Sequence, residues 1–233
     1  MHRFFSFTAV IAALSLLAAC GGGANMKAEL DATKEKKAKM AVVSLTVSDF
    51  GKTLQHGNSE DVGSLITKKM DEMLGLTETA FGAKWTIVPA ASIVAAEPYQ
   101  KLAKSKAEGN VFAPKPAGAQ MPIFAADRSD MVKTNLDPKM ATDLCQALGV
   151  DLITVVYSEW TTQTGGIIPT TKAYAKTVVS VYDSQGRRLF KGRKDLQGNK
   201  TLGAMGFAKV DEESLNVWVG AFQNGLDMML AEM

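Results

Sequence analysis

The sequence holds few of the side chains from which metal centres and nucleophilic active sites are built. Its 233 residues include two cysteines and two histidines, and Cys20 and His2 lie near its start. The other two, His56 and Cys145, do not have metal-ligand spacing. A lone histidine in a polar loop also needs a positioned partner to act as a general base. We therefore expect no metal, no cofactor and no enzyme activity, and a hydrolase that uses His56 is the least favoured alternative.

Charge of one sign is lacking as well. Twenty-six Lys and Arg residues stand against 24 Asp and Glu residues, and the formal net charge is +2. Loss of Arg3 with a signal sequence would leave 25 against 24. A chain this close to neutral has no general attraction for nucleic acid. We therefore expect no nucleic-acid partner.

The chain also lacks an apolar run long enough to span a bilayer. The run at its start, from Phe4 to Ala19, covers 16 residues, whereas a membrane-spanning helix needs about 20. It follows Arg3 and ends in small residues, which is typical of a secretory signal. We expect residues 1–19 to be a signal peptide that is removed.

The end of this run, Leu17-Ala18-Ala19-Cys20, resembles the lipobox of bacterial lipoproteins. The resemblance implies cleavage before Cys20, a diacylglycerol on its sulfur, and a third acyl chain such as palmitate on the new amino group. Several acyl chains hold a protein stably at a membrane, since each buried CH₂ contributes about 0.8 kcal/mol. Because Gly21 follows the cysteine where an Asp would retain the protein at the inner membrane, the resemblance implies the periplasmic face of the outer membrane. The alternative is an ordinary signal-peptidase site beside an unrelated cysteine.

The rest of the chain divides into a polar segment and a folded domain. Residues 20–39 are nearly free of apolar side chains after Cys20, and they predict a tether that is disordered or transiently helical. As a flexible coil this tether would span about 25 Å on average. Residues 40–233 alternate between the periodicities of strands and helices. We expect them to form one periplasmic α/β domain.

The predicted elements of this domain follow one another in the order β-α-β-α-β-β-β-α, which predicts an α/β fold with a single mixed sheet. The strand-helix-strand start favours parallel pairing of the first two strands, and Pro89 favours an edge strand or a bulge. Cys145 falls on the apolar stripe of a helix, so we expect it to be a core residue and not a reactive thiol. The predicted elements are strand 40–51, helix 61–75 ending at Gly75, strand 84–94, helix 136–149, strands 150–160, 172–183 and 188–196, a loop over 198–210, and helix 211–233.

Two sequence stretches in this order resemble a group of periplasmic proteins that share the amino-terminal domain of the translocation protein TolB. They are "MATDLCQALGVDLITVVYSEW", in which a helix runs directly into a strand, and "TVVSVYDSQGRRLFKG", in which two strands flank a turn. The group includes the lipoprotein that activates penicillin-binding proteins and the curli-secretion and Pel-export lipoproteins. The resemblance implies a non-enzymatic module that binds another envelope protein or copies of itself. It gives no place to the irregular stretch 108–135.

Three stretches are candidates for partner contact. The first is the basic run 187–194, which would face an acidic surface or, alternatively, protect an edge strand from unwanted pairing. The second is a hairpin tip that would be either exposed or folded back on its sheet. The third is the irregular stretch, since long loops in compact domains are usually functional or disordered. The candidate residues are Phe112, Phe124, Ile167, Ile168, Arg187, Arg188, Lys191, Arg193 and Lys194.

These expectations combine into one hypothesis of function. The protein is expected to be a lipid-anchored binding or assembly module of the cell envelope. Its partners would be the membrane, through the N-terminal lipid, and another envelope protein or copies of itself. The alternative is a subunit of a self-assembling ring or pore of an export system.

Overall fold

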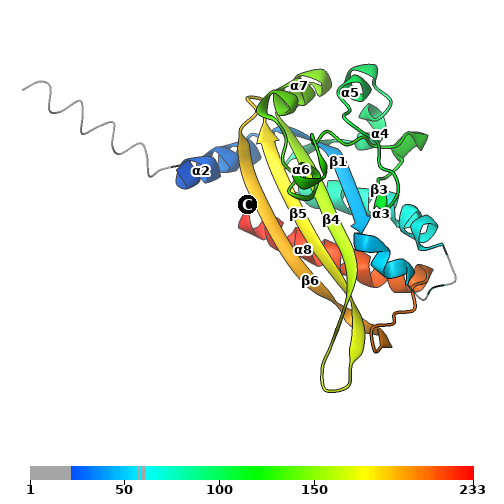
Figure 1. Ribbon diagram of the computed structural model, residues 1–233. Coiled ribbons are helices and arrows are strands. Elements are labelled where there is room, and N and C mark those ends of the chain that lie inside the picture. The colour runs from blue at the N-terminus through cyan, green and yellow to red at the C-terminus, as the bar shows by residue number, and fades with distance from the viewer. Residues whose placement is uncertain (1–21, 57, 59–60) are drawn as a thin grey trace, which may run out of the picture.

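The computed structural model describes residues 22–56, 58 and 61–233. The predicted signal peptide, lipobox and Cys20 therefore lie outside the described residues. The described chain folds around one mixed sheet in the order β2-β1-β4-β5-β6, with β3 paired to the free side of β1 (Figure 1). This confirms the predicted fold class. The strands are β1 (Lys39–Asp49), β2 (Thr86–Val88), β3 (Val111–Phe112), β4 (Leu152–Gly165), β5 (Thr170–Asp183) and β6 (Arg188–Ala204).

The helices connect these strands in the predicted order, with several short elements added between β2 and β4. The three long helices of the domain are α3, α7 and α8, and a further helix, α2, precedes β1. No helix among the described residues is both long and apolar enough to cross a membrane. The helices are α2 (Gly22–Glu35), η1 (Phe50–Gln55), α3 (Val62–Gly82), α4 (Ala90–Ile93), α5 (Glu97–Lys101), η2 (Pro116–Gly118), α6 (Arg128–Val132), α7 (Pro138–Leu148) and α8 (Glu212–Glu232).

Strand pairing follows from the length of each connection. β1 pairs in parallel with β2 and with β4, because a helical crossover precedes each of these partners. β4, β5 and β6 are joined by tight turns and pair antiparallel. β2 is an edge strand, as predicted, but it ends at Val88 and not at Val94, because the residues after Pro89 form the short helix α4. The central position of β4 explains why its first nine residues are all buried.

Two layers of helices enclose the sheet. α3 and α8 pack against each other and cover the face seen from behind in Figure 1, where Trp160 of β4 stacks on Trp218 of α8 at 6.2 Å. α6 and α7 lie on the opposite face, over the end of the sheet that also holds α2. α7 begins at its cap Asp137 and ends at Gly149, whose φ of 62° is the left-handed conformation expected there. The far half of this second face carries no helix.

Three further predicted segments differ from the structure, and each difference has a physical reason. α3 continues past Gly75 to Gly82, because burial of Thr77 and Phe81 outweighs the cost of one helical glycine. β6 extends through the predicted 198–210 loop as far as Ala204, because pairing with β5 continues to the tip of the hairpin. Residues 22–35, predicted as part of a disordered or transiently helical tether, form the helix α2, because that helix packs on the domain.

Candidate interaction surface

The end of the molecule that holds α2 is closed by internal contacts. Leu30 of α2 is 2% exposed in the core, and Thr33 Oγ1 accepts a hydrogen bond from Trp85 Nε1 at 2.9 Å. Lys34 donates to the carbonyl oxygen of Met233, which places the last residue of the chain beside α2. Glu29 forms an ion pair with Arg187 at 2.8 Å. Four separate contacts therefore fix α2 to the domain.

The opposite end of the sheet is formed by the β4–β5 hairpin tip, the loop after β6 and η1, and we call it the distal end. The N–H of Met205 donates to the carbonyl of Pro169 at 3.0 Å, which holds the loop against the hairpin. His56, at the end of η1, stacks on Phe207 of the same loop with 6.3 Å between ring centroids. Figure 1 shows the tip and the loop at the lower end of the sheet, away from α2. Three segments distant in sequence thus meet there.

Exposed apolar side chains gather at the distal end. Seven large apolar side chains are exposed among the described residues, and five of them belong to these three segments. Ile167 is fully exposed and Ile168 is 77% exposed, so the alternative in which the tip folds back onto its sheet is wrong. Apolar surface gathered in this way is typical of an interaction site. The five side chains are Phe50, Ile167, Ile168, Met205 and Phe207.

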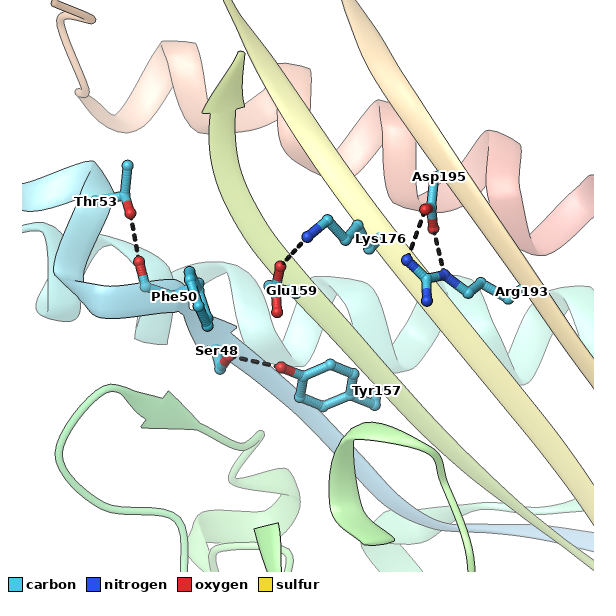
Figure 2. A network of polar contacts seen from close by, with 8 residues as sticks. All are labelled: Ser48, Phe50, Thr53, Tyr157, Glu159, Lys176, Arg193 and Asp195. Carbon is cyan, nitrogen blue, oxygen red and sulfur yellow. Dashed lines mark hydrogen bonds and ion pairs between the residues drawn. The ribbon is translucent and has the colours of Figure 1, made fainter. Parts of the chain in front are cut away.

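Beside the distal end, the helix-free face of the sheet carries paired charges (Figure 2). Lys176 of β5 forms an ion pair with Glu159 of β4 at 2.5 Å, and its Nζ lies 6.0 Å from the centre of the Phe50 ring. Arg193 binds Asp195 through two hydrogen bonds of 2.8 and 2.7 Å. Because these charges satisfy one another, this face is a solvated sheet surface next to the apolar end.

The basic residues of the run 187–194 have different partners in the structure. β6 is the edge strand of the sheet, which agrees with the reading that charge protects an edge. Arg187 binds Asp183 as well as Glu29, and these contacts raise the pKa of its guanidinium further. Arg188 and Lys191 both donate to Asn135 Oδ1, at 2.9 and 3.2 Å.

The remaining two residues of the run lie on opposite faces of β6. Arg193 faces the helix-free side with Asp195, and Lys194 pairs with Glu232 of α8 on the other side. Alternation along a strand makes this division unavoidable. The five cations therefore do not form one patch, and partner contact by any of them stays a prediction.

The irregular stretch 108–135 is ordered and contributes to the core. Phe124 is 2% exposed and packs edge-on against Tyr99 at 5.1 Å, so its expected role in partner contact is wrong. Phe112 is half-buried, and its ring lies close to Gly63 of α3. The N–H of Met121 donates to the carbonyl of Pro114 at 3.0 Å. Proline interrupts helices and strands because it has no N–H, but its carbonyl oxygen still accepts hydrogen bonds. Local hydrogen bonds therefore take the place of regular secondary structure in this stretch.

Cys145 and His56 are the two side chains that the sequence offers for chemistry, and they lie in different surroundings. Cys145 is 1% exposed in the core, and burial raises the pKa of its thiol to about 12. That value suits a core residue and not a nucleophile. His56 is exposed against Phe207. Among residues 22–56, 58 and 61–233, no group of three or more His, Cys, Asp or Glu side chains is placed to hold a metal ion.

One buried polar pair was not predicted from the sequence. Asp49 lies at the end of β1, where its Oδ1 accepts a hydrogen bond from the N–H of Leu54 at 3.0 Å. Its Oδ2 is buried without a hydrogen bond, and so is Nε1 of Trp160, the residue that pairs with Asp49 across β1 and β4. Burial raises the pKa of the Asp49 carboxyl, although the N–H groups of Leu54 and Thr53 partly oppose this. This carboxyl therefore binds the backbone of η1, the element that contains the exposed Phe50.

Known proteins resemble this chain in structure and not in sequence. No protein-family model matches the sequence, and no curated protein sequence matches it. Among solved structures, lipoprotein GNA1162 from Neisseria meningitidis is 17% identical with a TM-score of 0.36, covering 80% of this chain and 96% of that one. The LpoB C-terminal domain from Salmonella enterica is 11% identical with a TM-score of 0.32, covering 72% and 94%.

A third structure, protein CT253 from Chlamydia trachomatis, is 14% identical with a TM-score of 0.38, covering 84% of this chain and 92% of that one. The structures that resemble this chain therefore include a bacterial lipoprotein. The resemblance to the TolB amino-terminal group stays a prediction.

Proposed function

We propose that this chain is a lipid-anchored, non-catalytic binding module of the cell envelope that contacts another envelope protein through its distal end. The observation that carries the proposal is the position of the exposed apolar side chains, which gather at the end of the sheet opposite α2. A lipid on Cys20 would attach the protein next to α2, because Gly22 begins that helix two residues later. The contact surface would then face away from the lipid.

The dimensions of the chain support this orientation. The 14 residues of α2 rise about 21 Å along the helix axis. From the Asp183 turn, which binds Arg187 beside α2, β5 extends about 43 Å to the hairpin tip. An anchor at one end and an apolar surface at the other suit a module that presents its binding surface at a distance from the membrane. We place it on the periplasmic face of the outer membrane because of Gly21.

Assembly with copies of itself is the second candidate, and one observation favours it. β6 is an edge strand of 17 residues, and a second chain can add to such an edge. A ring or pore subunit would use this edge to close an assembly. Mass photometry of the detergent-solubilised protein separates the candidates, because a discrete large oligomer supports the ring and a monomer supports the binding module.

The anchor itself is tested with the full chain and its Cys20→Ser variant. Intact-mass spectrometry is expected to show wild-type protein that begins at Cys20 and carries three acyl chains. The variant is expected to leave the membrane fraction and remain folded by circular dichroism. Membrane association of the variant after a high-salt wash, or wild-type protein without added acyl mass, would contradict the proposal.

A further inference from the structure

The segments that form the distal end carry more lysines than carboxylates. Residues 161–182 of the hairpin contain Lys172 and Lys176, and residues 196–210 contain Lys200 and Lys209. Neither range contains an Asp or Glu, and the range 50–56 adds Lys52, whose charge acts on the buried carboxyl of the preceding Asp49. Lysines therefore outnumber carboxylates at this end, although the chain as a whole is nearly neutral.

Three of these five lysines have no ion pair within the described chain. Lys176 pairs with Glu159, and Lys209 pairs with Asp211 at 3.0 Å. Lys52, Lys172 and Lys200 make no ion pair with any residue that the structure describes. Of the acidic residues near the start of α8, Glu212 already pairs with Lys68 at 3.6 Å. The distal end thus combines exposed apolar side chains with lysines that make no ion pair among the described residues.

We infer that the distal end binds an acidic amphipathic segment of a protein, in which apolar side chains are flanked by Asp and Glu. This inference rests on the proposed function and specifies its partner. The apolar side chains of such a segment would bury Ile167, Ile168, Met205 and Phe207. Its carboxylates would pair with Lys52, Lys172 and Lys200 at the rim, where charge selects partners and speeds their association. A basic segment would be repelled.

An anionic lipid surface has the same combination of charge and apolar groups, but the dimensions disfavour it. The hairpin tip lies about 43 Å along β5 from the turn that fixes α2. A membrane that holds a lipid on Cys20 is therefore at the other end of the molecule. The attraction of a charged surface falls off within about 10 Å at ordinary salt. A protein segment is the occupant that reaches the distal end.

Photo-crosslinking in cells tests this inference with the full chain. A benzoylphenylalanine in place of Ile168 reports on the distal end, and the same residue in place of Met26, which is 41% exposed on α2, is the matched control. Sequencing of the adduct identifies the captured segment. We expect a protein segment with apolar residues and an excess of Asp and Glu over Lys and Arg, captured from position 168 and not from position 26.

Charge reversal gives the second readout. In the protein crosslinked from position 168, Lys172→Glu combined with Lys200→Glu is expected to reduce the yield at least about tenfold. The control combines Lys104→Glu with Lys106→Glu, two exposed lysines outside the segments that form the distal end, and is expected to leave the yield unchanged. All four positions are exposed or half-exposed, so each variant is expected to fold, and circular dichroism verifies this.

Several outcomes would overturn the inference. They are capture of a neutral or basic segment, lipid as the sole adduct, a yield that does not respond to the reversal at 172 and 200, or no adduct above that from position 26. Failure of the proposed function is a different result, namely wild-type protein without acyl mass or outside the envelope. Binding of the synthetic captured segment to purified protein, followed by fluorescence anisotropy, would still succeed in that case. The two failures are therefore distinguishable.

Discussion

The two ends of the molecule differ in how far their side chains satisfy one another. At the α2 end, Glu29, Thr33 and Lys34 each find a partner within the chain, and Leu30 is buried. At the distal end, isoleucines are exposed, and Lys172 and Lys200 make no ion pair with any residue that the structure describes. The contacts at the α2 end stabilise the fold, whereas the exposed side chains at the distal end can still form contacts with a partner. Substitutions at the first end should affect stability, and substitutions at the second should affect interaction.

The largest expected effect on stability is that of Leu30→Ala on α2. Removal of a side chain that is 2% exposed should lower the free energy of unfolding by about 3 kcal/mol. Urea denaturation followed by circular dichroism measures it. The control is Met26→Ala, one helical turn earlier and 41% exposed, which should change stability by less than about 0.5 kcal/mol. Equal effects of the two substitutions would show that α2 is not docked on the domain.

A smaller effect is expected from Asp211→Ala, at the point where the distal loop enters α8. Asp211 accepts a hydrogen bond from the N–H of Ser214 at 2.8 Å, and Ser214 Oγ accepts one from the N–H of Asp211. Loss of this cap should lower the free energy of unfolding by about 1 kcal/mol. Asp211→Asn keeps a capping oxygen and should cost less. If both variants unfold at the same urea concentration, the cap is not the cause.

Asp49→Asn should change how stability depends on pH. Because burial raises the pKa of Asp49, the folded state binds a proton more tightly than the unfolded state does. The stability from this proton is fully present below pH 3.8 and is lost as the pH rises through the raised pKa. The wild type should therefore lose stability relative to Asp49→Asn over that interval. Urea titrations from pH 3 to pH 7 test this, and a difference that is constant with pH would refute it.

The smallest effect on stability is expected at the hairpin tip. Ile167→Asp combined with Ile168→Asp removes apolar side chains that make little contact within the chain, so the free energy of unfolding should change by less than about 0.5 kcal/mol. The same protein should lose its crosslinks from an unaltered neighbouring position, such as Met205. A large loss of stability would mean that the tip packs on the domain in solution. That result would remove the difference between the two ends.

The parts of the fold that were predictable have strong local signals. α7 has Asp137 and Pro138 at its start and Gly149 at its end, and β4 has a continuous apolar run that indicates a central strand. The hairpin tip was also predictable, because Gly165 and Gly166 precede Ile167 and Ile168 between two strand-like segments.

The parts that were not predictable depend on contacts between distant residues. α2 has a polar composition, and its helix is fixed by Trp85, Arg187 and Met233, which no local pattern connects to it. Phe124 stood among prolines and proved to be a core residue because Tyr99 packs against it. The pairing of Asp49 with Trp160 required the register of two strands that are 111 positions apart in sequence. The type of each side chain could be taken from the sequence, but the residues that it contacts could not.

The docking of α2 on the domain has a mechanical consequence. A disordered linker would let the domain sample many heights above a membrane, whereas a helix fixed to the sheet makes the chain from Gly22 to the hairpin tip a single stiff spacer. If Cys20 carries the lipid, the spacer's length determines the height at which a binding partner must present its complementary surface. A partner would then be selected by the height of its surface above the membrane as well as by the chemistry of that surface.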